Sequence, residues 1–291
     1  MTGHDQHGSG ATTLPSMTFS IVARSDDGES WGVAVASKFL AVGSVVPAAV
    51  AEVGAIATQA WANVAYKGQA LSLLDEGATA SVALQRLLEE DEGREHRQVG
   101  LVDGEGGAAS HTGTSCLAWA GGRTGDGYAI QGNILTGEEV VLAMEAAWHD
   151  VSDPGVTLAR RLLAALRAGD ETGGDSRGRQ SAALFVVSQG AGYDGGDDVA
   201  VDLRVDDHED PCAELARLLD LNEWYLTPPD EADREPLTDE IRAELEDFAQ
   251  REGKESFAAW VGAENVEMRV GEEWVDRRIL EQVRATQSDD R

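Results

Sequence analysis

Amide side chains stand at the ends of two apolar runs, where they could touch a reacting group. Gln59 and Asn63 lie in TQAWAN, and Gln131 and Asn133 lie in YAIQGN. A buried amide needs hydrogen-bond partners. It can find them in the polar groups of a substrate or an oxyanion, or in a neighbouring turn. The residues favour neither role, so all four are candidate substrate-binding residues.

Lys38 is the single residue that carries most information. The chain avoids lysine, with only Lys38, Lys67 and Lys254, yet it keeps one directly after the apolar run GVAVAS. A lysine there can lower the pKa of a nucleophile or stabilise a developing oxyanion. The structural alternative is a strand-end lysine whose stem covers apolar surface while its charge stays in water. We favour the functional role, and Ser37 beside it is a candidate substrate-binding residue.

A glycine-rich loop, GGDSRGRQSA at 173–182, carries two further basic side chains. It lacks the Lys-Ser/Thr ending and the following helix of a phosphate loop, which argues against nucleotide binding. Arg177 and Arg179 suit a substrate carboxylate through a bidentate contact. The structural alternative is an internal salt bridge to the acidic segment DLRVDDH at 202–208.

No metal and no cofactor is expected. His96 and His111 show no zinc-ligand spacing with each other or with Cys116 and Cys212. The acidic residues of 202–208 are more typical of a strand-end salt-bridge set than of a metal site. The Ser-His-Asp order with G-x-S-x-G that marks an α/β-hydrolase is also missing.

The net charge excludes several classes of partner. The 291 residues hold 23 Lys+Arg and 53 Asp+Glu, which gives a formal charge of −30. A surface this anionic repels phosphate groups, so neither nucleic acid nor an anionic membrane is an expected partner. A carboxylate-rich, lysine-poor surface stays hydrated in concentrated salt, which indicates a halophilic source.

The first residues predict a cytoplasmic protein. Residues 1–16 are polar and small, without the apolar stretch of a signal peptide, and are expected to be a disordered lead. No apolar run approaches the roughly 20 residues that a membrane helix needs. Two cysteines far apart in the sequence are typical of free thiols in a reducing compartment.

The elements that would position these residues follow from the hydrophobic pattern. Strands are predicted at 18–23, 31–37, 53–59, 97–103, 107–112, 115–121, 128–133, 181–189 and 199–205. Helices are predicted at 66–76, 79–91, 137–149 and 155–168. The strands carry long apolar stretches rather than strict alternation, so both faces of each sheet should be covered. Two stacked sheets with a helix pair on each outer face, a four-layer αββα sandwich of the α+β class, satisfy this pattern.

The sandwich would occupy 17–210, followed by a small, mostly helical module at 211–285 and a tail at 286–291. The module is near the lower size at which a domain folds alone. Its aromatic residues Trp224, Tyr225, Trp260 and Trp274 would suit stacking on sugar rings if they were exposed. At helical spacing they are more typical of a small core, which is the preferred interpretation.

Seven segments in the first 210 residues resemble one known family. They are MTFSIVAR (17–24), GVAVASKFLAVGSVVP (32–47), GAIATQAWAN (54–63), RQVGLVD (97–103), YAIQGNIL (128–135), GGDSRGRQSAAL (173–184) and DLRVDDH (202–208). Together they resemble domain-of-unknown-function family 1028, for which an N-terminal-nucleophile (Ntn) hydrolase fold is predicted. The later segments LDLNEWYL, FAAWVGAENVEMRV and DRRILEQVR resemble, more loosely, a peptidoglycan-binding-like module carried by some members. The resemblance implies the fold and assigns no reaction.

The resemblance also implies a nucleophile at the start of the first strand, where Thr18 directly follows Met17. Once residues 1–17 are removed, the Thr18 hydroxyl could attack an amide carbonyl while the freed α-amine acts as base. In proteasome-type members of the fold a lysine lies near the nucleophile, which implies a similar place for Lys38. The alternative is that Thr18 and Ser20, which share a sheet face, are ordinary strand residues.

The preferred hypothesis is an Ntn amidohydrolase that acts on a small amide or peptide-like substrate. Thr18 would be its nucleophile, and Lys38 the electrostatic partner. The alternative is a non-catalytic binding or assembly protein that uses the same sandwich, with the C-terminal module contacting a glycan or another protein. By analogy with the fold, the chain is expected to form a homo-oligomer.

Overall fold

The structure is a computed structural model that describes residues 18–151 and 155–289. The lead predicted at 1–16 lies outside the described residues. The chain divides into two compact units, Met1–Leu215 and Ala216–Arg291, and the boundary falls within helix α5 (Pro211–Leu226). The predicted mixture of α-helices and β-sheets is confirmed.

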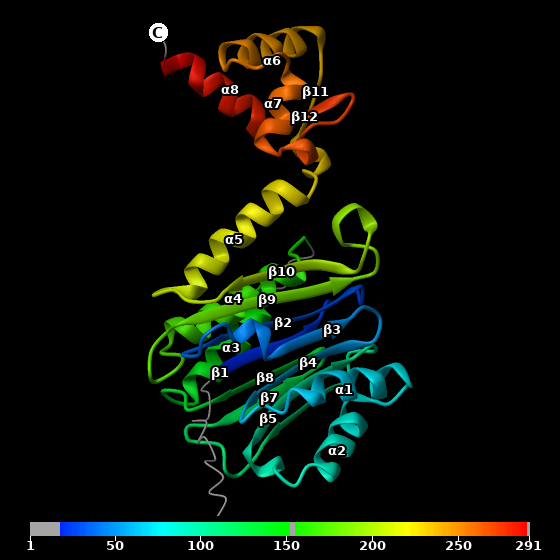
Figure 1. Cartoon of the computed structure of the whole chain (residues 1–291), viewed down its shortest axis with the longest axis vertical. Coiled ribbons are helices and arrows are strands. Elements are labelled where there is room, and N and C mark those ends of the chain that lie inside the picture. Colours follow the sequence, from blue (N-terminus) through cyan, green and yellow to red (C-terminus); the bar gives the residue numbers. More distant parts are fainter. Residues whose placement is uncertain (1–17, 152–154, 290–291) are drawn as a thin grey trace, which may run out of the picture. The chain divides into compact units, whose positions relative to one another are not determined.

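The first unit contains a six-stranded antiparallel sheet in the order β10-β9-β2-β1-β8-β7 (Figure 1). The strands are β1 (Thr18–Arg24), β2 (Ser30–Ser37), β7 (Gly121–Gly125), β8 (Tyr128–Asn133), β9 (Ser181–Ser188) and β10 (Val199–Val205). The β-branched runs of β1 and β2 form an antiparallel hairpin, in which Phe19 pairs with Ala36. On its other side β1 pairs with β8, so that Thr18 lies opposite Asn133.

The second sheet is antiparallel and has the order β3-β4-β5-β6. Its strands are β3 (Pro47–Val50), β4 (Gly54–Ala60), β5 (Arg97–Asp103) and β6 (Ala108–Thr112). The four residues of β3 gave no separate signal in the sequence. The strand predicted at 115–121 is wrong, because β7 begins only at Gly121. The carbonyl oxygens of Leu117 and Trp119 instead accept hydrogen bonds from the backbone of Ile134 and Leu135.

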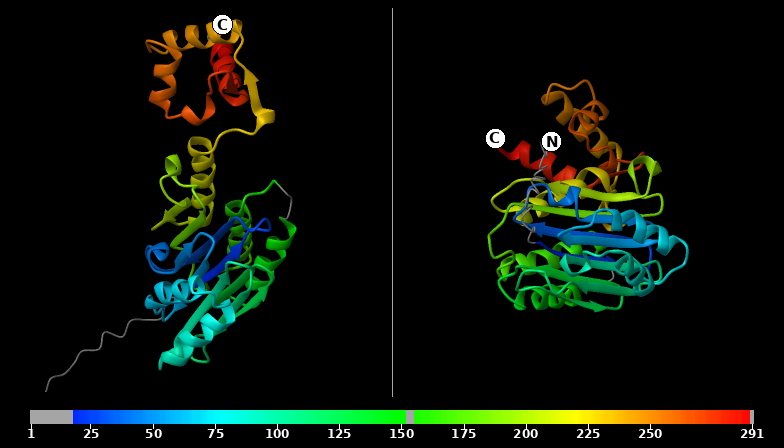
Figure 2. Two further views of the ribbon diagram at one scale, coloured as in Figure 1. Left: turned by 90° about the vertical axis from the view of Figure 1, so that its right-hand side faces the viewer. Right: turned by 60° about the horizontal axis from the view of Figure 1, so that its bottom comes forward.

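The two sheets pack face to face, with β1 and β2 against β3 and β4. Helices α3 and α4 cover the outer face of the larger sheet, and α1 and α2 cover that of the smaller sheet (Figure 1, and from two further directions Figure 2). The helices are α1 (Ala65–Asp75), α2 (Ala80–Glu90), α3 (Glu139–Asp150) and α4 (Leu158–Glu171). Thr79 is the cap of α2, since its side chain accepts a hydrogen bond from the Val82 N–H.

Short 3-10 turns lie between these elements. They are η1 (Val42–Ser44), η2 (Arg94–His96), η3 (Tyr193–Gly195), η4 (Glu231–Asp233) and η5 (Glu267–Arg269). Within the described residues, every helix is too short or too polar to cross a lipid bilayer.

The space between the two sheets changes character along the strands. At one end it is apolar, with Val22, Val33 and Val35 fully buried. Burying such a side chain stabilises the fold by about 1.5–3 kcal/mol. Towards the start of β1 the space becomes polar, because Thr18 and Ser20 face the same side of the sheet as Val22.

After α5, the second unit is built on three helices and a short two-stranded antiparallel sheet. They are α6 (Asp239–Arg251), α7 (Phe257–Glu264), α8 (Arg277–Asp289), β11 (Arg234–Pro236) and β12 (Trp274–Asp276). Trp260 lies in the core of this unit. Trp224 lies against the guanidinium groups of Arg269 and Arg278, each 4.7 Å from the ring centre. Both tryptophans therefore stabilise the unit itself, and α8 extends into the residues predicted as a tail.

Candidate functional site

Thr18 lies in a buried polar cluster between the two sheets. Its hydroxyl oxygen Oγ1 is 3.2 Å from Ser37 Oγ. Its carbonyl oxygen accepts hydrogen bonds from Gln59 Nε2 at 3.1 Å and from Asn133 Nδ2 at 3.3 Å. Asn133 comes from the same sheet and Gln59 from the opposite one. Both sheets therefore fix the position at which β1 begins.

Gln98, the second residue of β5, joins the amides of the cluster. Its Oε1 accepts hydrogen bonds from Gln59 Nε2 and Asn133 Nδ2, both at 2.9 Å. Its Nε2 donates to Thr112 Oγ1 at 2.9 Å and to two backbone carbonyl oxygens. The sequence interpretation missed Gln98. The signal was present, because Gln98 is an amide within an apolar strand, as Gln131 is.

Gln131 and Ser20 complete the cluster. Gln131 Nε2 donates to Ser20 Oγ, and Ser20 Oγ donates to Gln59 Oε1, both at 2.6 Å. The other end of the Gln131 amide lies against Gly100, where an added Cβ would be 2.0 Å from Oε1. Gly100 therefore leaves the space that this amide fills. Among the described residues, Gln131 Oε1 and Asn133 Oδ1 are buried acceptors with no hydrogen-bond partner.

The seven side chains of this polar cluster are each at most 2% exposed: Thr18, Ser20, Ser37, Gln59, Gln98, Gln131 and Asn133. Five of them are candidates from the sequence. A buried acceptor without a hydrogen bond costs about 1–3 kcal/mol. Apolar side chains would fill the same space without that cost, so the polar cluster indicates a functional constraint. Its hydroxyls and amides hydrogen-bond to one another and to the backbone, and none of them takes up a proton near neutral pH.

The predicted basic residues bind other parts of the chain. Lys38 is exposed, and its Nζ donates to the Arg179 carbonyl oxygen at 3.0 Å, while its backbone N–H donates to Asp175 Oδ2 at 2.7 Å. Arg177 pairs with Asp175 at 3.2 Å and Arg179 with Asp170 at 2.8 Å. Burial raises the pKa of Asp170, against the opposing effect of Arg179. Both arginines thus have carboxylate partners outside the segment 202–208.

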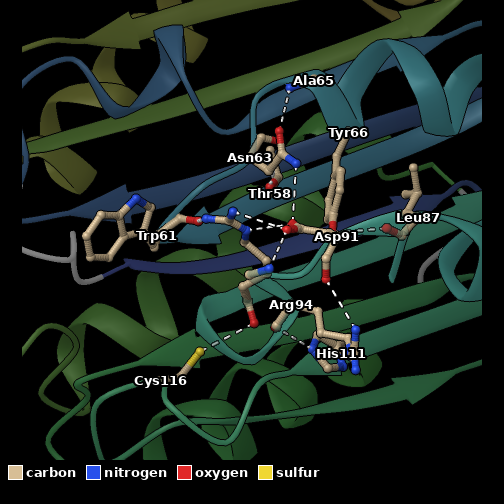
Figure 3. A network of polar contacts seen from close by, with 12 residues as sticks. Thr58, Trp61, Asn63, Ala65, Tyr66, Leu87, Asp91, Arg94, His111 and Cys116 are labelled. Atoms are coloured by element: carbon tan, nitrogen blue, oxygen red, sulfur yellow. Dashed lines mark hydrogen bonds and ion pairs between the residues drawn. The ribbon is translucent and has the colours of Figure 1, made fainter. Parts of the chain in front are cut away.

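Asn63 belongs to a separate network centred on Asp91 (Figure 3). Asp91 Oδ2 accepts hydrogen bonds from Arg97 Nε and Tyr66 OH, both at 2.8 Å, and from Asn63 Nδ2 at 3.4 Å. The Arg97 guanidinium holds the pKa of Asp91 well below its usual range. Burial, together with Asp91, raises the pKa of Tyr66. Arg97 also donates to the Trp61 carbonyl oxygen at 2.6 Å, so the network holds the loop that follows β4.

The described residues contain no cluster of three or more His, Cys, Asp or Glu side chains with a geometry that could hold a metal ion. The polar cluster itself offers hydroxyl and amide oxygens only. Its chemistry is therefore that of hydrogen bonding and, at Thr18, Ser20 and Ser37, of hydroxyl nucleophiles.

Residues 18–215 match the model of one protein family, described as "Family of unknown function (DUF1028)". The chain belongs to DUF1028. The crystal structure of a DUF1028 protein from Silicibacter pomeroyi is similar to it, with a TM-score of 0.63 and 30% sequence identity. That similarity covers 75% of this chain and 93% of the other. No curated protein matches the chain.

Membership of DUF1028 confirms the family resemblance of the sequence segments between 17 and 210. The description of DUF1028 assigns no activity. Any role of this DUF1028 chain must therefore be argued from its own residues.

Proposed function

We propose that this chain is an Ntn amidohydrolase, which cleaves a small amide or peptide-like substrate once Thr18 has become its first residue. The observation that carries the proposal is the polar cluster. It holds a hydroxyl at the first position of β1 and surrounds it with groups that orient but do not ionise. Such a site lacks only a base, and a freed α-amine on Thr18 would supply one directly beside the hydroxyl.

The reaction would run in two steps. Thr18 Oγ1 attacks the amide carbonyl carbon, and its proton passes to the α-amine and then to the leaving amine as the C–N bond breaks. Water then attacks the resulting ester of Thr18 with the α-amine again as base, which releases the carboxylic acid and restores the hydroxyl. Amide and water thus give acid and amine. Ser37 Oγ, 3.2 Å away, would orient the Thr18 hydroxyl throughout.

Lys38 keeps its proposed role as electrostatic partner. Its ammonium now binds the Arg179 carbonyl oxygen, and the side chain is exposed. An exposed lysine gives up one such hydrogen bond at a cost of about 0.5–1.5 kcal/mol. The side chain could therefore turn towards an oxyanion that develops at Thr18.

The fold supports the same proposal. Two antiparallel sheets stacked between two helix pairs correspond to the αββα sandwich of Ntn hydrolases, and Thr18 begins a central strand of the larger sheet. This assignment rests on the layer order and on the position of Thr18.

The test is a protein that begins at Thr18, made by cutting a removable tag directly before that residue. We expect the trimmed protein to react with a β-lactone probe and to gain its mass on Thr18, whereas the full chain and trimmed Thr18→Ala do not. Thr124→Ala, an exposed threonine on β7, is the matched control and should react fully. Equal labelling of trimmed protein and Thr18→Ala would rule the mechanism out. The intact mass of protein from its native host shows whether this form occurs.

The alternative, a non-catalytic binding or assembly protein, is favoured by one observation. Thr18 is fully buried in the structure. The alternative predicts that the chain stays full-length in the native host and that the β-lactone probe labels neither the full chain nor the trimmed protein. In that case a glycan array with the full chain, compared with Tyr225→Ala, would test the proposed contact of the C-terminal unit.

A further inference from the structure

Three loops beside the polar cluster expose large apolar side chains. Phe39 and Leu40 follow Ser37 and Lys38 directly, and Leu40 is 59% exposed. Trp61, which follows β4 and its Gln59, is 44% exposed. Leu117 is 52% exposed, and its carbonyl oxygen binds the N–H of the residue after Asn133. In this chain of net charge −30, each of these exposed apolar side chains lies next to a residue of the polar cluster, either along the chain or through a backbone hydrogen bond.

The backbone of these loops is strained at three points. Ala41, Ala60 and Ile134 have φ values of 53°, 62° and 51°. A left-handed conformation costs about 1–2 kcal/mol for a residue with a Cβ, and a β-branched residue such as Ile134 seldom adopts it. Strain of this kind is found mostly at functional sites, where the surrounding structure enforces it.

Arg97 ties two of the loops together. Its guanidinium donates to the Trp61 carbonyl oxygen, and its own carbonyl oxygen accepts from Cys116 Sγ at 3.4 Å, next to Leu117. Asp91 in turn holds the guanidinium of Arg97 (Figure 3). The loops that carry Trp61 and Leu117 are therefore fixed, although their apolar side chains are open to solvent.

Trp61 is held by its backbone rather than by its ring. The indole makes an edge contact with His96, at 5.9 Å between ring centres, and Figure 3 shows it pointing away from Asp91. Nearly half of the side chain remains open. A rigid, half-exposed aromatic ring costs little conformational entropy when it binds an apolar group.

We propose that these loops bind a neutral, large apolar side chain of the substrate, and that Trp61 and Leu117 are the residues that contact it. The substrate would then be an amide that carries an aromatic or branched aliphatic group next to the scissile carbonyl. This inference rests on the proposed function, because it assumes that the carbonyl reaches Thr18. A neutral group is favoured because the protein carries excess negative charge and because Arg97, which binds the Trp61 backbone, is already paired with Asp91.

The catalytic test compares p-nitroanilides of leucine and alanine with the trimmed protein. We expect kcat/KM to favour leucine by roughly tenfold or more, the discrimination that an apolar pocket gives. In Trp61→Ala and Leu117→Ala that ratio should fall towards one, because kcat/KM for leucine should fall by more than kcat/KM for alanine. Val82→Ala, an exposed valine on α2, is the matched control and should keep the wild-type ratio.

A binding test separates this inference from the proposed function. Saturation-transfer NMR with trimmed Thr18→Ala should detect N-acetylphenylalaninamide but not N-acetylglycinamide, and Trp61→Ala should abolish the signal. Binding without hydrolysis by the trimmed protein would contradict the proposed amidohydrolase activity but support the apolar binding site. Hydrolysis without a preference for leucine would contradict the apolar binding site but support the amidohydrolase activity. A concentration-dependent dimer that Trp61→Ala dissolves would show that the loops bind a second copy instead, which overturns the inference.

Discussion

At the scale of single residues, the distinctive feature is the polar cluster between the two sheets. Apolar side chains could be buried there at a lower cost in free energy. The amides of Gln59 and Asn133 both donate to Gln98 Oε1 and to the Thr18 carbonyl oxygen, so replacing any one of the three amides removes a hydrogen bond from another. This mutual dependence explains why amides rather than charged groups occupy the site. An amide offers a donor and an acceptor without the larger cost of burying a charge.

Gln98→Leu should destabilise the protein more than the same substitution at an exposed glutamine. It would remove one acceptor from each of two buried amides, and it would remove the donor to Thr112 Oγ1 and to two backbone carbonyl oxygens. We expect a loss of about 2 kcal/mol or more in the free energy of unfolding, since each unpaired buried group costs about 1–3 kcal/mol. Urea denaturation measures it. The control is Gln85→Leu on the exposed face of α2, with an expected change within about 0.5 kcal/mol.

The pH dependence of kcat/KM tests the base. The α-amine must be neutral to take the Thr18 proton, and a free α-amine has a pKa of about 7.7–8.0. Activity of the trimmed protein should therefore rise with pH and level off above that value. A rate that is flat from pH 6 to 9 would show that some other group accepts the proton.

At the scale of elements, β1 is the strand on which the site depends, because it pairs with β2 and β8 and faces the second sheet. Strand β4, which packs against β1, is followed by the loop to α1, and a second loop joins α2 to β5. Those two loops meet at the ion pair between Asp91 and Arg97, whose side chains are 11% and 17% exposed. The pair lies near the protein surface, and through the hydrogen bond from Arg97 to the Trp61 carbonyl oxygen it fixes the backbone position of Trp61.

Asp91→Asn should weaken the protein in a pH-dependent manner. The pKa of Asp91 is lowered in the folded state, first of all by Arg97. Its contribution to stability is therefore present above the unfolded value of about 3.9 and is lost as the pH falls through the folded value. We expect Asp91→Asn to cost about 1–3 kcal/mol at pH 7. The difference from wild type in urea denaturation should shrink below about pH 4; a difference that stays constant from pH 7 to pH 3 would contradict this.

At the scale of the whole molecule, the dominant quantity is the charge of −30. Carboxylates that repel one another favour the expanded chain, and salt weakens the repulsion because the Debye length falls from about 10 Å at 0.1 M to about 3 Å at 1 M. Internal ion pairs such as Arg269 with Asp276, which are buried, are screened much less.

The melting temperature should therefore rise between 0.1 M and 2 M KCl. NaCl at equal ionic strength should give the same increase, since screening depends on charge density and not on the identity of the cation. Differential scanning calorimetry measures both series. A melting temperature that falls or stays constant with added salt would remove the argument for a halophilic source.

The sequence by itself determined what depends on neighbours along the chain. The strands β1, β2, β5, β8 and β10 could be predicted because propensity and periodicity act over a few neighbouring residues. The segment 115–121 shows the limit of such patterns. Its apolar residues are typical of a strand, yet two of its carbonyl oxygens accept hydrogen bonds from the backbone N–H groups that directly follow β8.

Only the tertiary structure decided which polar residues meet. Gln59 and Asn63 are four positions apart, but one faces Thr18 and the other binds Asp91. The hydrogen bonds that join Asn133 to Gln98 and to Thr18 span 35 and 115 positions of sequence. Contacts at that separation depend on the register of each strand and on how the sheets stack, which are properties of the whole packed core and not of any short segment.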